Sequence, residues 1–157
     1  MTISSRKLTR SLAPIAVALV AAGCGGAATM TGAPATGVPD ATIAAKSNKL
    51  GTILVDADGR TLYLFEQDKG TASTCYGACA SAWPPVTTDA RAVAGTGIDA
   101  AKLGTTTRKD GVKEVTYGGH PLYTYAGDAK SGDTTGQNLD QFGAEWYVLA
   151  PTGSKIK

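Results

Sequence analysis

The chain contains a single histidine, His120. A Ser-His-Asp hydrolase needs a histidine beside an activated serine, and no serine stands in a nucleophile-elbow pattern. Zinc and copper sites usually combine several histidine and cysteine ligands, so we interpret His120, between Gly119 and Pro121, as a turn residue. No Cys-x-x-Cys-His sequence is present for haem attachment. We therefore expect no catalytic set, no metal site and no cofactor.

The chain also lacks an apolar run long enough to span a membrane. Its most apolar stretch, Leu12 to Ala22, has about half of the roughly 20 residues that a spanning helix requires, and Pro14 lies near its start. Gly23 and Cys24 follow this stretch, and three basic residues precede it: Arg6, Lys7 and Arg10. This order predicts a secretion signal over residues 1–23.

Cysteine is scarce, which makes the position of Cys24 informative. It directly follows small residues, so the segment resembles a lipobox, with Ala21 where leucine or valine is more common. We expect cleavage before Cys24 and a lipid anchor on its thiol, with the membrane as a partner. The anchored protein would lie on the extracytoplasmic side of the cell membrane or envelope. A secreted protein that is cleaved nearby is the alternative.

An excess of one charge is absent as well. Removal of the signal takes three of the 15 basic residues and none of the 13 acidic ones, which leaves 12 minus 13, or −1, in the mature chain. No basic patch is available, so we expect no nucleic-acid partner. The lipid, rather than charge, would hold the protein at the membrane.

Residues 24–49 show no sustained apolar period. They are rich in alanine, threonine and glycine and contain Pro34 and Pro39, a composition that predicts a flexible tether after the lipidated cysteine. The remaining residues, 50–157, have the length of one ordinary domain.

Short strands and turn sequences characterise this domain. Asp58-Gly59 predicts a hairpin between strands at Gly51–Val55 and Arg60–Phe65. Both faces of the second strand are apolar, so we expect it to be buried on both sides. Further strands are predicted at Thr105–Lys109, Val112–Tyr117, Pro121–Tyr125 and Glu145–Ala150. With one short helical turn at 76–82, the sequence predicts an all-β fold, a small antiparallel sheet or meander.

Cys75 and Cys79 are the two cysteines of this domain. Export to an oxidising compartment favours a disulfide between them, and a separation of four residues in one helical turn brings the α-carbons within range. Loop entropy gives such a link only about 2 kcal/mol. A redox role is the alternative, although thioredoxin-like pairs have two intervening residues rather than three.

One six-residue sequence occurs twice. Tyr63 to Asp68 (YLFEQD) recurs as Tyr123 to Asp128 (YTYAGD), and each copy follows a leucine and a glycine turn at the same distances. This indicates two copies of one hairpin unit, around residues 51–68 and 112–128.

The chain resembles the bacterial lipoproteins named for a Tyr-x-(Phe/Trp/Tyr)-x-x-Asp motif, known as secreted repeats of unknown function. The resemblance covers roughly residues 50–153 and rests on both motif copies and on three stretches in the same order: Cys75-Tyr-Gly-Ala-Cys79-Ala with Trp83-Pro84-Pro85, Tyr117-Gly-Gly-His120-Pro121-Leu122-Tyr123, and Gly136-Gln137 followed by Trp146. It implies an envelope lipoprotein with no assigned biochemical activity.

The motif itself has two interpretations. In the structural one, its rings fill the core and its aspartates cap backbone amides in the following turns. In the functional one, the motif forms an aromatic platform for a sugar or another flat ligand, with the aspartates binding hydroxyl groups. Six residues would form this ligand face: Tyr63, Phe65, Asp68, Tyr123, Tyr125 and Asp128. We favour the structural interpretation because strands this apolar are usually buried.

Two classes of function are compatible with these features. The first is a non-catalytic envelope module that binds a cell-wall polymer, a small ligand or an envelope protein. The second is a redox participant, in which tyrosines and tryptophans of the domain relay electrons or the cysteine pair cycles.

Overall fold

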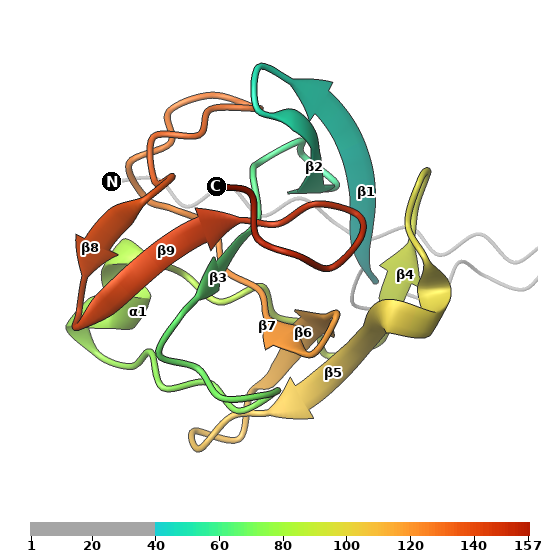
Figure 1. Ribbon diagram of the computed structural model, residues 1–157. Coiled ribbons are helices and arrows are strands. Elements are labelled where there is room, and N and C mark those ends of the chain that lie inside the picture. The colour runs from blue at the N-terminus through green and yellow to red at the C-terminus, as the bar shows by residue number, and fades with distance from the viewer. Residues whose placement is uncertain (1–39) are drawn as a thin grey trace, which may run out of the picture. The chain divides into compact units, whose positions relative to one another are not determined.

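Short strands make up most of the regular secondary structure (Figure 1). The computed structural model describes residues 40–157, so the predicted signal, Cys24 and the first part of the predicted tether lie outside the described residues. The strands are β1 (Ala41–Asn48), β2 (Gly51–Asp56), β3 (Tyr63–Phe65), β4 (Ala92–Ala94), β5 (Leu103–Thr107), β6 (Lys113–Tyr117), β7 (His120–Pro121), β8 (Leu139–Gln141) and β9 (Ala144–Val148). A helix, α1 (Ala78–Ala82), and a 3-10 turn, η1 (Ala100–Lys102), complete the described elements.

The strands form three sheets of three strands each within the described residues. Their orders are β2-β1-β4, β3-β9-β8 and β5-β6-β7. All neighbours are antiparallel except β1 and β4, which run parallel. The all-β prediction is therefore confirmed, with a short helix that contains Cys79 and a parallel pair in place of a simple meander.

The predicted tether extended too far along the chain. Its last residues form β1, which pairs with β2 from Ile43 opposite Asp56 to Asn48 opposite Gly51. Ile43 is fully buried in the core. The strand was missed because Ile43 is the one large apolar side chain among small and polar neighbours, which gives almost no alternating pattern.

The predicted hairpin around the Asp56 to Gly59 turn is present, with Val55 opposite Thr61, but it is shorter than predicted. Asp56 N donates to Arg60 O at 3.0 Å, and Asp56 Oδ1 accepts from Arg60 N at 2.8 Å. Beyond this turn, β2 takes β1 as its partner and β3 takes β9. The local hairpin therefore extends only to Leu54 and Leu62, and β3 then pairs with the distant β9.

The strand that ends at Phe65 is buried on both faces, as predicted. Tyr63 and Phe65 belong to one apolar cluster, whereas Leu62 and Leu64 belong to a second. All four side chains are at most 2% exposed. The segment therefore lies between the two clusters and makes them one continuous core.

Candidate functional site

The two motif copies meet at their first tyrosines. Tyr63 N donates to Tyr123 O at 2.9 Å, and Tyr123 N donates to Tyr63 O at 3.0 Å, as in an antiparallel bridge. Both side chains are fully buried. Because the two bonds are reciprocal, the two copies are related at this point by an approximate two-fold rotation.

Each motif aspartate accepts a hydrogen bond from the tyrosine of the other copy. Tyr63 Oη donates to Asp128 Oδ2 at 2.7 Å. Tyr123 Oη likewise donates to Asp68 Oδ2 at 2.7 Å. We call these two contacts the crossed Tyr–Asp bonds.

The other oxygen of each aspartate caps the loop after its own copy. Asp68 Oδ1 accepts from Thr74 N at 2.7 Å and from Thr74 Oγ1 at 2.6 Å. Asp128 Oδ1 accepts from Thr135 N at 2.9 Å and from Thr135 Oγ1 at 2.6 Å. The aspartates thus cap backbone amides, as the structural interpretation of the motif predicted.

Burial is the main reason that the pKa of Tyr63 and that of Tyr123 are raised above the ordinary value of 10. The hydrogen bond to Asp128 adds to the effect on Tyr63, and the negative charge of Glu114 adds to the effect on Tyr123. Both hydroxyls therefore keep their protons at neutral pH and remain donors in the crossed Tyr–Asp bonds.

The residue that follows each tryptophan also pairs with the other motif copy. Leu64, in the first motif copy, is the register partner of Tyr147 in β9. Thr124, at the corresponding place in the second copy, donates its N–H to Pro84 O at 2.9 Å. Tyr147 directly follows Trp146, the tryptophan after the second copy, whereas Pro84 directly follows the tryptophan after the first. Each motif strand is thus completed by a segment from the other repeat.

Two closed cycles, each of three backbone hydrogen bonds, also join segments of one repeat to the other. The first cycle joins Leu54, Leu62 and Leu149. The second joins the corresponding residues Val115, Leu122 and Val86. In each cycle, two members come from the hairpin of one repeat and the third comes from the tryptophan segment of the other. The two repeats are therefore interlocked rather than placed side by side.

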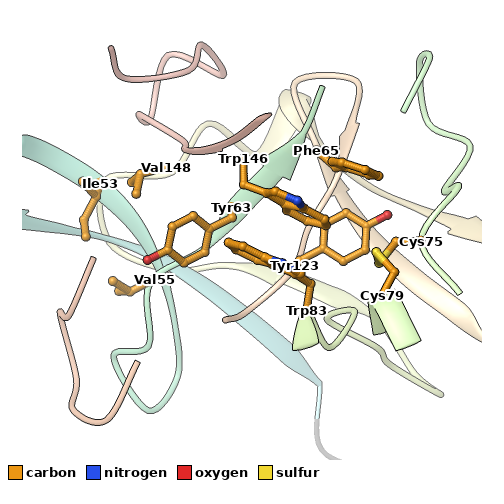
Figure 2. Packing of buried hydrophobic residues seen from close by; sticks show 10 residues of the cluster. All are labelled: Ile53, Val55, Tyr63, Phe65, Cys75, Cys79, Trp83, Tyr123, Trp146 and Val148. Carbon is orange, nitrogen blue, oxygen red and sulfur yellow. A yellow bond between two sulfur atoms is a disulfide. The ribbon is translucent and has the colours of Figure 1, made fainter. Parts of the chain in front are cut away.

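Four aromatic rings stack through the centre of this arrangement. Trp83 and Trp146 stack on each other with centroids 3.9 Å apart and planes inclined by 5°. Phe65 stacks on Trp146 at 4.0 Å, and Tyr125 stacks on Trp83 at 4.2 Å. Figure 2 shows the two indoles with Tyr63 on one side and Tyr123 and the disulfide on the other. The second aromatic residue of each motif copy thus packs on the tryptophan of the other repeat.

The motif rings do not form an open platform for a ligand. Tyr63, Phe65 and Tyr123 are at most 2% exposed, and Asp68 is 6% exposed. Tyr125 and Asp128, the other candidate ligand residues of the second copy, are only partly buried. A flat ligand cannot stack on the first tyrosine of either copy without opening the core, so only Tyr125 offers it part of a ring.

The disulfide between Cys75 and Cys79 is present, with α-carbons 5.2 Å apart. Cys75 is fully buried and Cys79 is 6% exposed, within the same apolar cluster as Trp83. Because both sulfurs are shielded from solvent, a thiol reagent has little access to them. This burial favours a structural link over a cycling redox pair.

A buried ion pair, which the sequence interpretation missed, supports the disulfide loop. The Arg108 guanidinium donates to Glu114 Oε2 and Ser73 Oγ, each at 2.8 Å, and to Cys75 O at 2.7 Å. Ser73 Oγ lies 2.7 Å from Tyr123 Oη, so this network reaches the crossed Tyr–Asp bonds. The available signal was two opposite charges in the neighbouring predicted strands Thr105–Lys109 and Val112–Tyr117.

Burial raises the pKa of Glu114 to about 7, although its hydrogen bond and ion pair with Arg108 act in the opposite direction. Its second oxygen, Oε1, has no hydrogen-bond partner within the described residues. Of the groups in this network, the Glu114 carboxyl is thus the one whose burial costs free energy of folding.

Two hollows lie away from the motif. One, of about 380 Å³, is lined by Asn48, Lys49, Gly132, Asp133, Thr134 and Thr135. The other, of about 350 Å³, is lined by Asp40, Ala41, Thr42, Asp56, Ala57, Asp58, Val86 and Thr87. Neither hollow is lined by an aromatic residue. Among residues 40–157, no group of three or more His, Cys, Asp and Glu side chains is placed to hold a metal ion.

Comparison with known proteins gives one family. The model of a family described as a secreted repeat of unknown function matches residues 44–87 and 104–150, more than half of the chain. Each match contains one motif copy and one tryptophan. The description indicates an extracytoplasmic location. No curated protein and no solved structure matches the chain. No helix among the described residues is long and apolar enough to cross a membrane.

Proposed function

Because the chain belongs to the family of secreted repeats of unknown function, we propose that it is a lipid-anchored envelope module that binds a wall polymer or an envelope protein and catalyses no reaction. The crossed Tyr–Asp bonds carry this proposal. They use the first tyrosine and the aspartate of each motif copy to lock the two repeats together. The motif then builds a rigid body whose outer surface is free to bind.

The anchor of this module would be the lipid on Cys24. Because β1 begins at Ala41, the predicted tether shortens to about 16 residues, with a mean reach of roughly 20 to 24 Å. This distance still allows the body to clear the lipid headgroups.

Cys24→Ser tests the anchor. The variant should lose incorporation of labelled palmitate and leave the membrane fraction, while the circular dichroism of the released body matches that of the protein without its signal. Continued membrane association without labelling would contradict the lipid anchor.

The released body then tests binding. It should be retained by purified envelope material, and Tyr63→Phe, which keeps the buried ring, should leave the retention of folded protein unchanged. Absence of retention would contradict the proposed binding function. Loss of retention in a folded Tyr63→Phe body would show that the motif is part of the ligand-binding site.

A redox participant is the second candidate, and the stack of rings favours it. Tyr125, Trp83 and Trp146 are three oxidisable side chains in direct succession, and Tyr125 at one end is partly exposed. Voltammetry of residues 40–157 should then show a reversible couple that Trp83→Phe removes. A protein without such a couple would eliminate this candidate.

A further inference from the structure

The turn between β8 and β9 holds an aromatic residue in an unfavourable backbone conformation. Gln141 pairs with Ala144, so Phe142 and Gly143 form a two-residue turn, and both have positive φ, 59° and 96°. Turns of this kind favour Asn-Gly, because a bulky side chain in the left-handed region is strained. The Phe142 side chain is also 45% exposed. Backbone strain and exposure of an apolar ring therefore coincide at one residue.

The residue before Phe142 is held firmly by the core. Trp83 Nε1 donates to Gln141 Oε1, and Trp146 Nε1 donates to Gln141 O, each at 3.0 Å. Both indoles are fully buried and stack on each other. The ring of Phe142 is thus mounted on a rigid base, which lowers the entropy that a partner must overcome on binding.

The flanks of the turn carry negative charge. Asp140 and Glu145 are direct register partners across the hairpin, an arrangement that is destabilising for like charges. Both are exposed, and neither forms an ion pair with any residue in 40–157. The turn lies at the left edge of the body in Figure 1. An exposed ring between two carboxylates therefore projects from the edge of the protein.

We propose that the β8–β9 tip, Asp140 to Glu145, docks into an apolar pocket of an envelope protein whose rim carries lysine or arginine. This inference rests on the proposed binding function and assigns it a site and a class of partner. Phe142 is the anchor that enters the pocket, as aromatic residues at interface centres do. Asp140 and Glu145 meet the basic rim.

Two features favour a protein over the other envelope components. Sites for small ligands and single sugar units are concave, whereas this tip is convex. A membrane surface that carries anionic lipids repels the two carboxylates. Charge and shape together therefore select a basic protein pocket.

The test uses the full anchored protein in its own cells, with a photoreactive phenylalanine analogue at position 67. Gln67 borders the tip, because a Cβ placed on Gly143 would come 3.2 Å from its Oε1. Illumination should give a discrete adduct with one protein. The adduct should fall at least ten-fold in Phe142→Asn and in the double variant Asp140→Lys, Glu145→Lys. Val112→Asn is the matched control, since Val112 is 40% exposed at the tip of another hairpin, and it should leave the adduct unchanged.

Phe142→Asn separates binding from folding, because it should raise the thermal midpoint by a few degrees while the adduct is lost. An adduct that survives both tip variants overturns the inference. So does an adduct that consists of wall polymer or lipid, or the absence of any adduct. In these cases the proposed binding function still stands if purified envelope material retains the released body, and it fails if retention is absent too.

Discussion

Removing the hydroxyl of Tyr123, as in Tyr123→Phe, should destabilise the protein by about 2 to 3 kcal/mol. The ring stays in place, so the change removes the contacts with Asp68 Oδ2 and Ser73 Oγ without creating a large cavity. Asp68 is 6% exposed, and a hydrogen bond to a buried charged group contributes about 1.5 to 3 kcal/mol. Water cannot easily replace the lost donor at such a depth.

Tyr63→Phe removes the equivalent bond of the other pair but should cost less, about 1 kcal/mol. Its acceptor, Asp128, is only partly buried, so solvent can take the place of the hydroxyl. Each variant removes the same two atoms from its tyrosine, the hydroxyl oxygen and its proton. The difference between them therefore reflects the burial of the acceptor together with the additional contact of Tyr123 Oη with Ser73 Oγ.

Urea unfolding followed by tryptophan fluorescence gives both free energies of unfolding, provided that the m-value is unchanged. A double-mutant cycle of Tyr123→Phe with Asp68→Asn should show coupling of about 1 to 2 kcal/mol. The cycle of Tyr63→Phe with Asp68→Asn, which joins residues of the same copy, should show coupling within about 0.5 kcal/mol of zero. Stronger coupling within one copy than between copies would refute the crossed Tyr–Asp bonds.

Two further predictions concern the disulfide and its supporting network. Replacing Cys75 and Cys79 together with alanine should lower the free energy of unfolding by about 2 kcal/mol, measured in urea against the oxidised protein; no change would show that the loop is held without the link. The raised pKa of Glu114, about 7 against 4.5, means that the folded protein keeps a proton that the unfolded chain releases. Its stabilising contribution is therefore complete below about pH 4.5 and is lost as the pH rises through about 7. Glu114→Gln should flatten the pH dependence between about pH 5 and pH 8, and an unchanged slope would assign it to other groups.

Local patterns were enough to predict much of the fold. The repeated motif, the turn at Asp56 to Gly59, the helical turn and the Cys75–Cys79 disulfide all depend on residues close together in sequence. Burial of Tyr63 and Phe65 followed from the apolar character of both strand faces. Each of these features depends on a short segment of neighbouring residues, so periodicity and spacing predict it.

The interlocking could not be predicted in the same way. Leu64 pairs with Tyr147, and nothing near Leu64 in the sequence specifies so distant a partner. The small residues of β1 likewise did not predict a strand, because β1 is a strand through its pairing with β2. For the candidate site, the repeat indicated aromatic residues, but it could not show that Tyr63 and Tyr123 face each other while Phe142 is the exposed ring. These relations exist only once distant segments pack.

Fragments 40–97 and 98–157, made separately and then mixed, test the interlocking of the repeats most directly. Each contains one motif copy and its own tryptophan but lacks the tryptophan segment that completes its motif strand. Each alone should give a poorly dispersed amide NMR spectrum, and the equimolar mixture should recover the dispersed spectrum of the intact body as a 1:1 complex. A fragment that folds alone would contradict the account, because its motif would then be completed by its own tryptophan segment.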